Sequence, residues 1–101
     1  MKLKDGVRLF QVKPQVILAA MIARDIWEEL GQELVITSGS EGSHSQYSAH
    51  YRGDALDFRT RYFNDVETAK AAKELTERLG TDFFVLVEKT HIHLQWRPEK
   101  L

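Results

Sequence analysis

This sequence has no cysteine and few residues of several other kinds, and each shortage excludes a class of structure. Without cysteine, the 101-residue chain can form neither a disulfide framework nor a thiolate metal site. Its longest apolar run, residues 16–23, is far too short to cross a bilayer. The first residues are basic but lack a following apolar stretch, so we see no secretory signal and expect synthesis in the cytoplasm.

The charges of the chain almost cancel, which argues against a polyanionic partner. The 14 Lys and Arg residues and 15 Asp and Glu residues give a formal net charge of −1. We therefore expect neither nucleic acid nor a membrane surface as a partner. Hydrophobic residues make up 43% of the chain and charged residues 29%, as in an ordinary soluble protein. At this length we expect a single domain over residues 1–101.

Two stretches have the apolar spacing of helices. The first, residues 14–30, starts with a proline, which suits a first helical turn, and is followed by Gly31 as a stop. The second starts at Asn64 or Asp65 and ends before Gly80. The apolar stripe of this second helix is expected at Val66, Ala69, Ala72, Leu75 and Leu79.

Four shorter stretches predict strands. Residues 34–36 form a short apolar run, residues 55–59 and 91–96 alternate in polarity, and residues 83–87 are apolar throughout. Because both faces of residues 83–87 are apolar, we expect this strand in the centre of the sheet. Residues 37–53 are polar and rich in glycine, which indicates a loop. The pattern predicts a small α+β domain with a mixed or antiparallel sheet and two main helices.

All four histidines fall in two short segments that also contain carboxylates. The first segment holds His44, His50 and Asp57, and the second holds Glu88, His91 and His93. Imidazole and carboxylate are the ligands that a borderline divalent ion such as zinc selects. The sequence therefore predicts a site for one zinc ion.

Strand alternation indicates how these side chains could meet. Around a two-residue hairpin, Glu88 and His91 face each other, and His93 shares their side of the strand. Asp57 lies on the face of its strand opposite to the apolar side chains. Together with His50, Asp57 and one histidine of the last strand would supply two imidazoles and one carboxylate. A fourth position would remain for water, as in catalytic zinc sites, and Glu88 would be the general base.

Residues 48–57 read S-A-H-Y-R-G-D-A-L-D and match every fixed position of the pattern S-x-H-x-x-G-x-A-x-D. This resembles the signature of the D-alanyl-D-alanine metallopeptidases, peptidoglycan peptidases that share their fold with the signalling domain of hedgehog proteins. The glutamate followed by His-x-His near the C-terminus resembles the second motif of this group. Residues 37–39, T-S-G, and a histidine six residues before His50 are most similar to the hedgehog-like or phage-type branch. The order of the expected elements agrees over residues 7–97.

The resemblance implies a hedgehog/D,D-peptidase-like fold and a role for each matching residue. His50 and Asp57 would bind Zn²⁺, with His93 as the third ligand. His91 would then stabilise the developing oxyanion, and Glu88 would act as the base. In other branches the glutamate stands three residues before the ligand, a spacing that would make His91 the third ligand instead.

The resemblance also implies a substrate, the stem peptide of peptidoglycan. We expect a D,D-carboxypeptidase or an endopeptidase of bacterial or phage origin, acting on the cell wall after release or as part of a phage particle. Substrate contacts are expected from His44, Ser48 and Arg52. Carboxypeptidase branches hold the substrate's terminal carboxylate with an arginine that residues 38–42 lack, and Arg52 or Arg59 are the candidates to replace it.

Two alternatives to an enzyme are open. A hedgehog-type domain would bind zinc without turnover, as a binding or structural module. The histidines could also cluster without any metal. The presence of the candidate base Glu88 favours an enzyme. The acidic calcium loop of hedgehog domains is not matched, because Glu41 alone does not make such a site.

Overall fold

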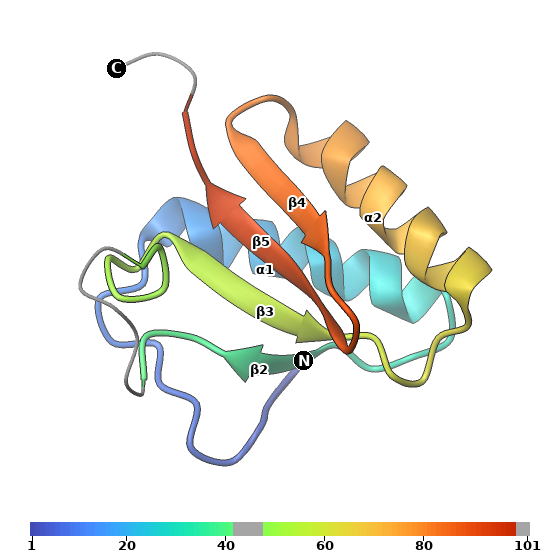
Figure 1. Cartoon of the computed structure of the whole chain (residues 1–101), viewed down its shortest axis with the longest axis horizontal. Coiled ribbons are helices and arrows are strands. Elements are labelled where there is room, and N and C mark those ends of the chain that lie inside the picture. Colours follow the sequence, from blue (N-terminus) through green and yellow to red (C-terminus); the bar gives the residue numbers. More distant parts are fainter. Residues whose placement is uncertain (42–47, 99–101) are drawn as a thin grey trace.

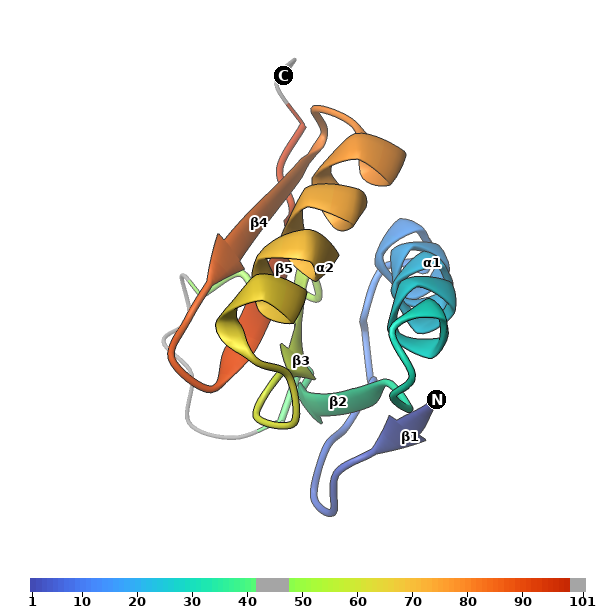
Figure 2. The ribbon, with the colours of Figure 1, turned by 90° about the vertical axis from the view of Figure 1, so that its right-hand side faces the viewer.

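The chain folds as a five-stranded sheet with two helices on one face (Figures 1 and 2). The structure is a computed structural model that describes residues 1–41 and 48–98. In chain order the elements are β1 (Lys2–Leu3), α1 (Pro14–Glu29), β2 (Val35–Ser38), β3 (Ala55–Arg59), α2 (Asp65–Leu79), β4 (Phe83–Val87) and β5 (His91–Trp96). The strand order is β1-β2-β3-β5-β4, with β1 parallel to β2 and every other pair antiparallel. The predicted α+β class with a mixed sheet is confirmed.

Helix α1 buries more core side chains than α2 and contacts the strand that carries the site. Pro14 stands at its first turn, and Gly31, at φ +84°, follows its C-terminal end as predicted. Trp27 is fully buried and its indole Nε1 donates to the main-chain oxygen of Arg59 at 3.0 Å. Its ring also meets Phe58 edge-on, with 5.7 Å between the ring centroids. This contact ties α1 to the end of β3.

Helix α2 starts where the sequence indicates, but its buried side is different from the predicted stripe. The Asn64 side-chain oxygen accepts from the Glu67 main-chain N–H, and the Glu67 carboxylate accepts from the Asn64 main-chain N–H, which makes a capping box. Val66, by contrast, is 77% exposed, and the fully buried residues are Ala71 and Leu75. The helix packs at the edge of the sheet against β4 and α1, so only a narrow side of it is covered.

Two strand predictions are wrong in detail. Strand β4 lies at the edge of the sheet and not at its centre, and Leu86 and Val87 are 40% and 50% exposed. An apolar run alone does not reveal whether neighbours cover both faces, and the central place in the sheet belongs to the alternating strand β3. Strand β2 continues through Thr37 and Ser38, which the sequence assigned to a loop, with a register irregularity before Ser38.

The pairing of β3 with β5 divides the sheet into an apolar face and a polar face. Leu56 and Phe58 on β3, with Ile92 and Leu94 on β5, are fully buried in the core under the helices. By strand alternation the residues between them point the other way. Asp57 pairs with His93 in this register, so the two polar side chains face each other across adjacent strands.

The loop before β3 is anchored to the segment before α1. Gly53 donates its main-chain N–H to the oxygen of His50 at 3.1 Å and accepts from the N–H of Lys13 at 2.9 Å. The Lys13 ammonium also pairs with the buried Asp54 carboxylate. Gly53 has φ +78°, and a Cβ there would lie 1.9 Å from the main-chain oxygen of Gln11. Only glycine fits this close approach.

Neither helix in the described part of the chain is long and apolar enough to cross a membrane.

Substitution of Gly53 tests this anchor. Gly53→Ala adds both the strain of a left-handed backbone and a main-chain collision, for a loss on the order of 3 kcal/mol in the free energy of unfolding. Gly31→Ala is the matched control, because its φ is +84° and nothing lies within 4 Å of the added Cβ. It should lose about 1 kcal/mol. Urea unfolding followed by circular dichroism measures both, and equal losses would contradict the close approach.

Candidate metal centre

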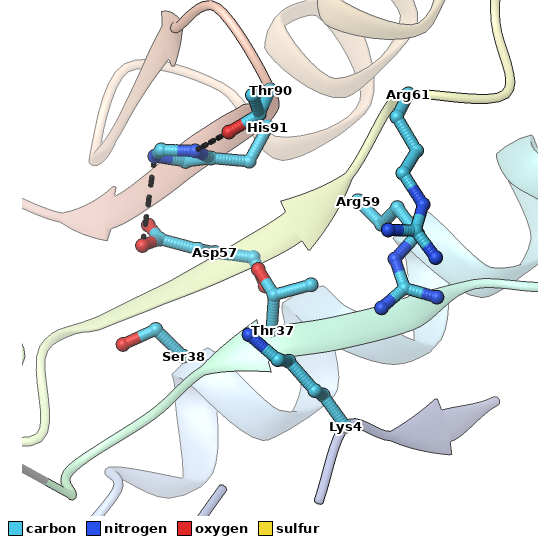
Figure 3. A pocket seen from close by; sticks show the side chains of 8 residues that line it. All are labelled: Lys4, Thr37, Ser38, Asp57, Arg59, Arg61, Thr90 and His91. Carbon is cyan, nitrogen blue, oxygen red and sulfur yellow. Dashed lines mark hydrogen bonds and ion pairs between the residues drawn. The ribbon is translucent and has the colours of Figure 1, made fainter.

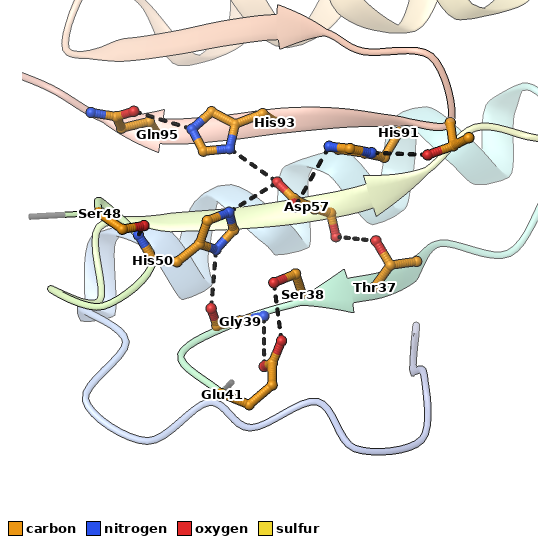
Figure 4. Close-up of polar contacts among 11 residues, drawn as sticks. Thr37, Ser38, Gly39, Glu41, Ser48, His50, Asp57, His91, His93 and Gln95 are labelled. Atoms are coloured by element: carbon orange, nitrogen blue, oxygen red, sulfur yellow. Dashed lines mark hydrogen bonds and ion pairs between the residues drawn. The ribbon is translucent and has the colours of Figure 1, made fainter. Parts of the chain in front are cut away.

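Three side chains from two strands and a loop converge on the polar face of the sheet (Figure 4). Asp57 comes from the middle of β3, His93 from the paired position on β5, and His50 from the loop before β3. His50 is only 7% exposed, and Asp57 and His93 are half-buried. One ligand atom of each residue lies within 4.8 Å of the other two, so this group could hold a metal ion.

The distances in the group are close to those of a small coordination shell. Asp57 Oδ1 lies 3.2 Å from His50 Nε2 and 3.0 Å from His93 Nδ1. For metal–ligand bonds of zinc length in a tetrahedral shell, neighbouring ligand atoms are about 3.3 to 3.6 Å apart. The two contacts of Asp57 Oδ1 are thus close to this spacing, and all three ligand atoms lie within 4.8 Å of one another, so a small adjustment of the side chains would place them around one ion.

The outer nitrogen of each imidazole is held by an oxygen. His50 Nδ1 lies 3.0 Å from the main-chain oxygen of Gly39, and His93 Nε2 lies 3.1 Å from Gln95 Oε1. A carbonyl oxygen only accepts, so each outer nitrogen carries the hydrogen and donates it. The inner nitrogens, His50 Nε2 and His93 Nδ1, then present lone pairs to the centre of the group. Outer hydrogen bonds of this kind orient the histidine ligands of metal sites.

These lone pairs create an electrostatic conflict that a cation resolves. A neutral His50 would point its Nε2 lone pair at the Asp57 carboxylate, and a neutral His93 would do the same with Nδ1. Positive charge between the three side chains turns both repulsions into attractions. Either an extra proton or a metal ion can supply that charge, and only a metal ion uses all three ligand atoms at once.

The ionisation of Asp57 agrees with a group built around positive charge. Burial alone would raise the pKa of the Asp57 carboxyl. When the imidazoles carry the extra proton, hydrogen bonds from His50 and His93, with the positive charge of His50 and His91, instead hold the pKa of Asp57 well below its usual range. The hydrogen bond to Asp57 raises the pKa of His93 against the opposing effect of burial, and the Gln95 contact and the charges of Asp57 and Glu88 add to it.

The turn that presents the Gly39 oxygen to His50 is itself held by Glu41. The Glu41 carboxylate accepts from the main-chain N–H groups of Arg8 at 2.9 Å and Gly39 at 2.8 Å, and from the Ser38 hydroxyl at 3.0 Å. Burial opposes ionisation of Glu41, but these bonds together keep its pKa below the ordinary value. Glu41 therefore fixes the turn that places the Gly39 oxygen against His50.

The two predicted catalytic residues lie beside the group. His91 Nε2 is 3.6 Å from Asp57 Oδ2, and its Nδ1 meets the Thr90 hydroxyl at 3.1 Å. Glu88 lies at the end of the β4–β5 hairpin, where its main-chain N–H donates to the His91 oxygen at 2.8 Å. Its side chain is exposed, and its charge contributes to the raised pKa of His93. Neither residue belongs to the three-residue group.

Two of the predicted substrate-binding residues, Ser48 and Arg52, lie elsewhere on the loop. The Ser48 hydroxyl accepts from the His50 main-chain N–H at 3.2 Å, a contact that supports the turn around His50. The Arg52 guanidinium pairs with Asp54, with Nε 3.1 Å from Oδ2. His44 lies outside the described residues.

The sequence analysis missed the oxygens that hold the outer nitrogens. Gln95 stands two residues after His93, so strand alternation could have placed it on the same face. The main-chain oxygen of Gly39 carries no sequence signal, because any residue has one. Its position depends on the turn that Glu41 holds.

Comparisons with models of known protein families and with curated proteins find no match to this chain.

Removal of individual ligands tests the group. Wild-type protein loaded with zinc should carry close to one ion per chain, by elemental analysis after gel filtration. His50→Ala, Asp57→Ala and His93→Ala should each weaken zinc binding by more than about 100-fold, because each removes a ligand rather than an outer partner. His91→Ala is the matched control and should keep its zinc. Loss of zinc from His91→Ala with retention in His93→Ala would assign the third ligand to His91.

The outer contact of His93 gives a subtler test. Gln95→Leu removes the acceptor that holds His93 Nε2, and it should weaken zinc binding about 10- to 100-fold in a chelator competition. Gln95→Glu keeps an oxygen acceptor at that position and should bind zinc nearly as well as wild type. Equal affinities of Gln95→Leu and wild type would show that the contact does not support a ligand.

Proposed function

We propose that this domain is a zinc-dependent peptidase that hydrolyses the stem peptides of peptidoglycan. The observation that carries the proposal is the convergence of His50 Nε2, His93 Nδ1 and an Asp57 oxygen within 4.8 Å. Within residues 1–41 and 48–98 this group has three members. Three protein ligands with an open position are typical of catalytic zinc, whereas structural sites use four.

The donor set favours zinc among the divalent ions. Two imidazole nitrogens with one carboxylate oxygen match the ligands of zinc hydrolases, while calcium and magnesium prefer shells of oxygen alone. When bound, zinc supplies Lewis acidity that polarises a peptide carbonyl and acidifies a water molecule to a pKa of about 7. The low pKa of Asp57 keeps its carboxylate charged and able to bind a cation at any physiological pH.

Glu88 is the residue that we assign as general base. It stands on the hairpin that continues from His93, and its charge is near enough to contribute to the raised pKa of that imidazole. A carboxylate there can take a proton from the attacking water and pass it to the leaving amine. His91 lies on the same strand face, and its Nε2 can donate to the oxyanion that forms on the scissile carbonyl.

The substrate assignment rests on the resemblance of residues 48–57 and of the Glu-x-x-His-x-His segment to the D-alanyl-D-alanine metallopeptidases. A D,D-carboxypeptidase and an endopeptidase are the two forms of the proposal. Either form would meet its substrate in the cell wall, after release or as part of a phage particle.

A zinc-binding module without turnover, of the hedgehog type, is the second candidate. It is favoured by one observation on Glu88, whose exposed side chain has no hydrogen bond to any residue in the described ranges. Without such a hydrogen bond, the Glu88 carboxylate would have to be positioned for proton transfer by the bound substrate.

Replacement of Glu88 separates the two candidates. Glu88→Gln should keep zinc and the fold but lower the rate of hydrolysis about 100- to 10,000-fold, the usual contribution of a general base. Mass spectrometry of a peptidoglycan digest with zinc-loaded protein measures the products. Glu77→Gln, an exposed glutamate on α2, is the matched control and should cleave like wild type. Absence of cleavage by the wild type itself would favour the binding module.

A further inference from the structure

The His91 ring lies between a hydroxyl and a carboxylate, at the side of a cavity next to the metal-binding group (Figure 3). Its Nδ1 is 3.1 Å from the Thr90 hydroxyl oxygen, and its Nε2 is 3.6 Å from Asp57 Oδ2. All three residues line the cavity, whose volume of about 270 Å³ leaves room for part of a substrate beside the imidazole. The Nε2 side of the ring thus faces the metal-binding group, and the Nδ1 side faces the hairpin turn.

The partner of the outer nitrogen distinguishes His91 from the two histidines of the metal-binding group. The outer nitrogens of His50 and His93 meet carbonyl oxygens, which accept hydrogen bonds but cannot donate them. The Thr90 hydroxyl at His91 can do either. The inner nitrogens of His50 and His93 are therefore left with lone pairs, whereas the inner nitrogen of His91 can carry a hydrogen.

The Asp57 carboxylate selects between the two neutral forms of His91. With the hydrogen on Nδ1, the Nε2 lone pair would face the carboxylate and be repelled by it. With the hydrogen on Nε2, both contacts are favourable, because the N–H faces the carboxylate and Nδ1 accepts from Thr90. The two contacts of the ring therefore favour the same form, in which Nε2 is the donor.

The turn that carries Thr90 is held by main-chain hydrogen bonds. The Glu88 N–H donates to the His91 oxygen at 2.8 Å, and the N–H of the buried Thr60 donates to the Thr90 oxygen at 3.3 Å. Hairpin turns of two residues favour pairs such as Asn-Gly that adopt positive φ, but Lys89 and Thr90 have negative φ. Departures from local preference are expected where function sets the residue, and here the unfavoured residue contacts His91.

We propose that Thr90 is a positioning residue, whose hydroxyl donates to His91 Nδ1 and so keeps the hydrogen of this imidazole on Nε2. An N–H at that position can donate to the oxyanion that forms on a scissile carbonyl, whereas a lone pair there would repel it. The same hydrogen keeps Nε2 from acting as a metal ligand, because a ligand nitrogen must offer a lone pair. Thr90 thereby gives His91 a role different from those of His50 and His93. This inference rests on the proposed peptidase function for the oxyanion and deepens it.

Nitrogen NMR of the zinc-loaded full chain tests the position of the hydrogen without any substrate. Two-bond hydrogen–nitrogen correlation spectra distinguish the two neutral forms of an imidazole, and a pH of about 8 is above the range in which free imidazole titrates. His91 should show the pattern of the form with its hydrogen on Nε2. A wild-type spectrum with the hydrogen of His91 on Nδ1 would overturn the proposal.

Variants of Thr90 test the source of the effect in the same spectra. Thr90→Val removes the donor, so the Nδ1 resonance of His91 should move toward that of an acceptor without a hydrogen bond. Thr90→Ser keeps a hydroxyl and should restore the wild-type shift. Thr76→Val is the matched control, because it removes the hydrogen bond of another exposed threonine, on α2, and should leave His91 unchanged. An identical Nδ1 resonance in Thr90→Val and wild type would contradict the donation.

Turnover separates positioning from a merely structural role. Thr90→Val should lower kcat for stem peptides several-fold, the size of one neutral hydrogen bond, with KM little changed and zinc retained. Thr90→Ser should recover the wild-type kcat. Equal kcat in Thr90→Val and wild type would overturn the positioning role. Thr90 is exposed, and if Thr90→Val still fails to fold, the wild-type spectrum and Thr90→Ser carry the test.

The two proposals fail separately. Cleavage of peptidoglycan by a protein whose His91 carries its hydrogen on Nδ1 keeps the peptidase and removes the role of Thr90. An Nε2–H form that depends on Thr90, in a protein that cleaves no peptidoglycan preparation, keeps the effect of Thr90 on His91 and removes the peptidase.

Discussion

The antiparallel pairing of β3 with β5 is the constraint on which both the core and the site depend. The register that sets Asp57 opposite His93 also buries Leu56, Phe58, Ile92 and Leu94 under the helices. A slip of one residue would turn those apolar side chains to the solvent and the polar ones into the core. The free energy of core burial therefore holds the ligand atoms in register, and the site needs no separate scaffold for two of its three members.

The third member depends on contacts between distant segments. His50 lies on a loop that is tied by Gly53 and Asp54 to the segment before α1, and its outer nitrogen is held by the Gly39 oxygen. Glu41 in turn holds the turn at Gly39. Each of these contacts satisfies a buried or half-buried polar group. Together they aim the lone pair of His50 at the place where a cation is needed, before any ion arrives.

The periodicity of the sequence predicted the features that depend on a single strand or helix. The extent of β3, the shared face of Asp57 and the hairpin histidines, and the Asn64 cap followed from local pattern. The edge position of β4, the buried side of α2 and the contact of Gly39 with His50 did not, because each depends on which distant segment lies alongside. The cavity lined by Lys4, Arg59 and His91 is of the same kind, because Lys4, just after β1, reaches it only through the pairing of β1 with β2.

The central claim is that His50, Asp57 and His93 together bind zinc. X-ray absorption at the zinc edge of the loaded protein tests it most directly, because the scattering of imidazole rings can be counted. The account predicts close to one zinc per chain in a four-coordinate shell with two imidazoles, the other ligands being oxygens. A shell with no imidazole, one imidazole or three imidazoles, or a protein that binds no zinc, would contradict it.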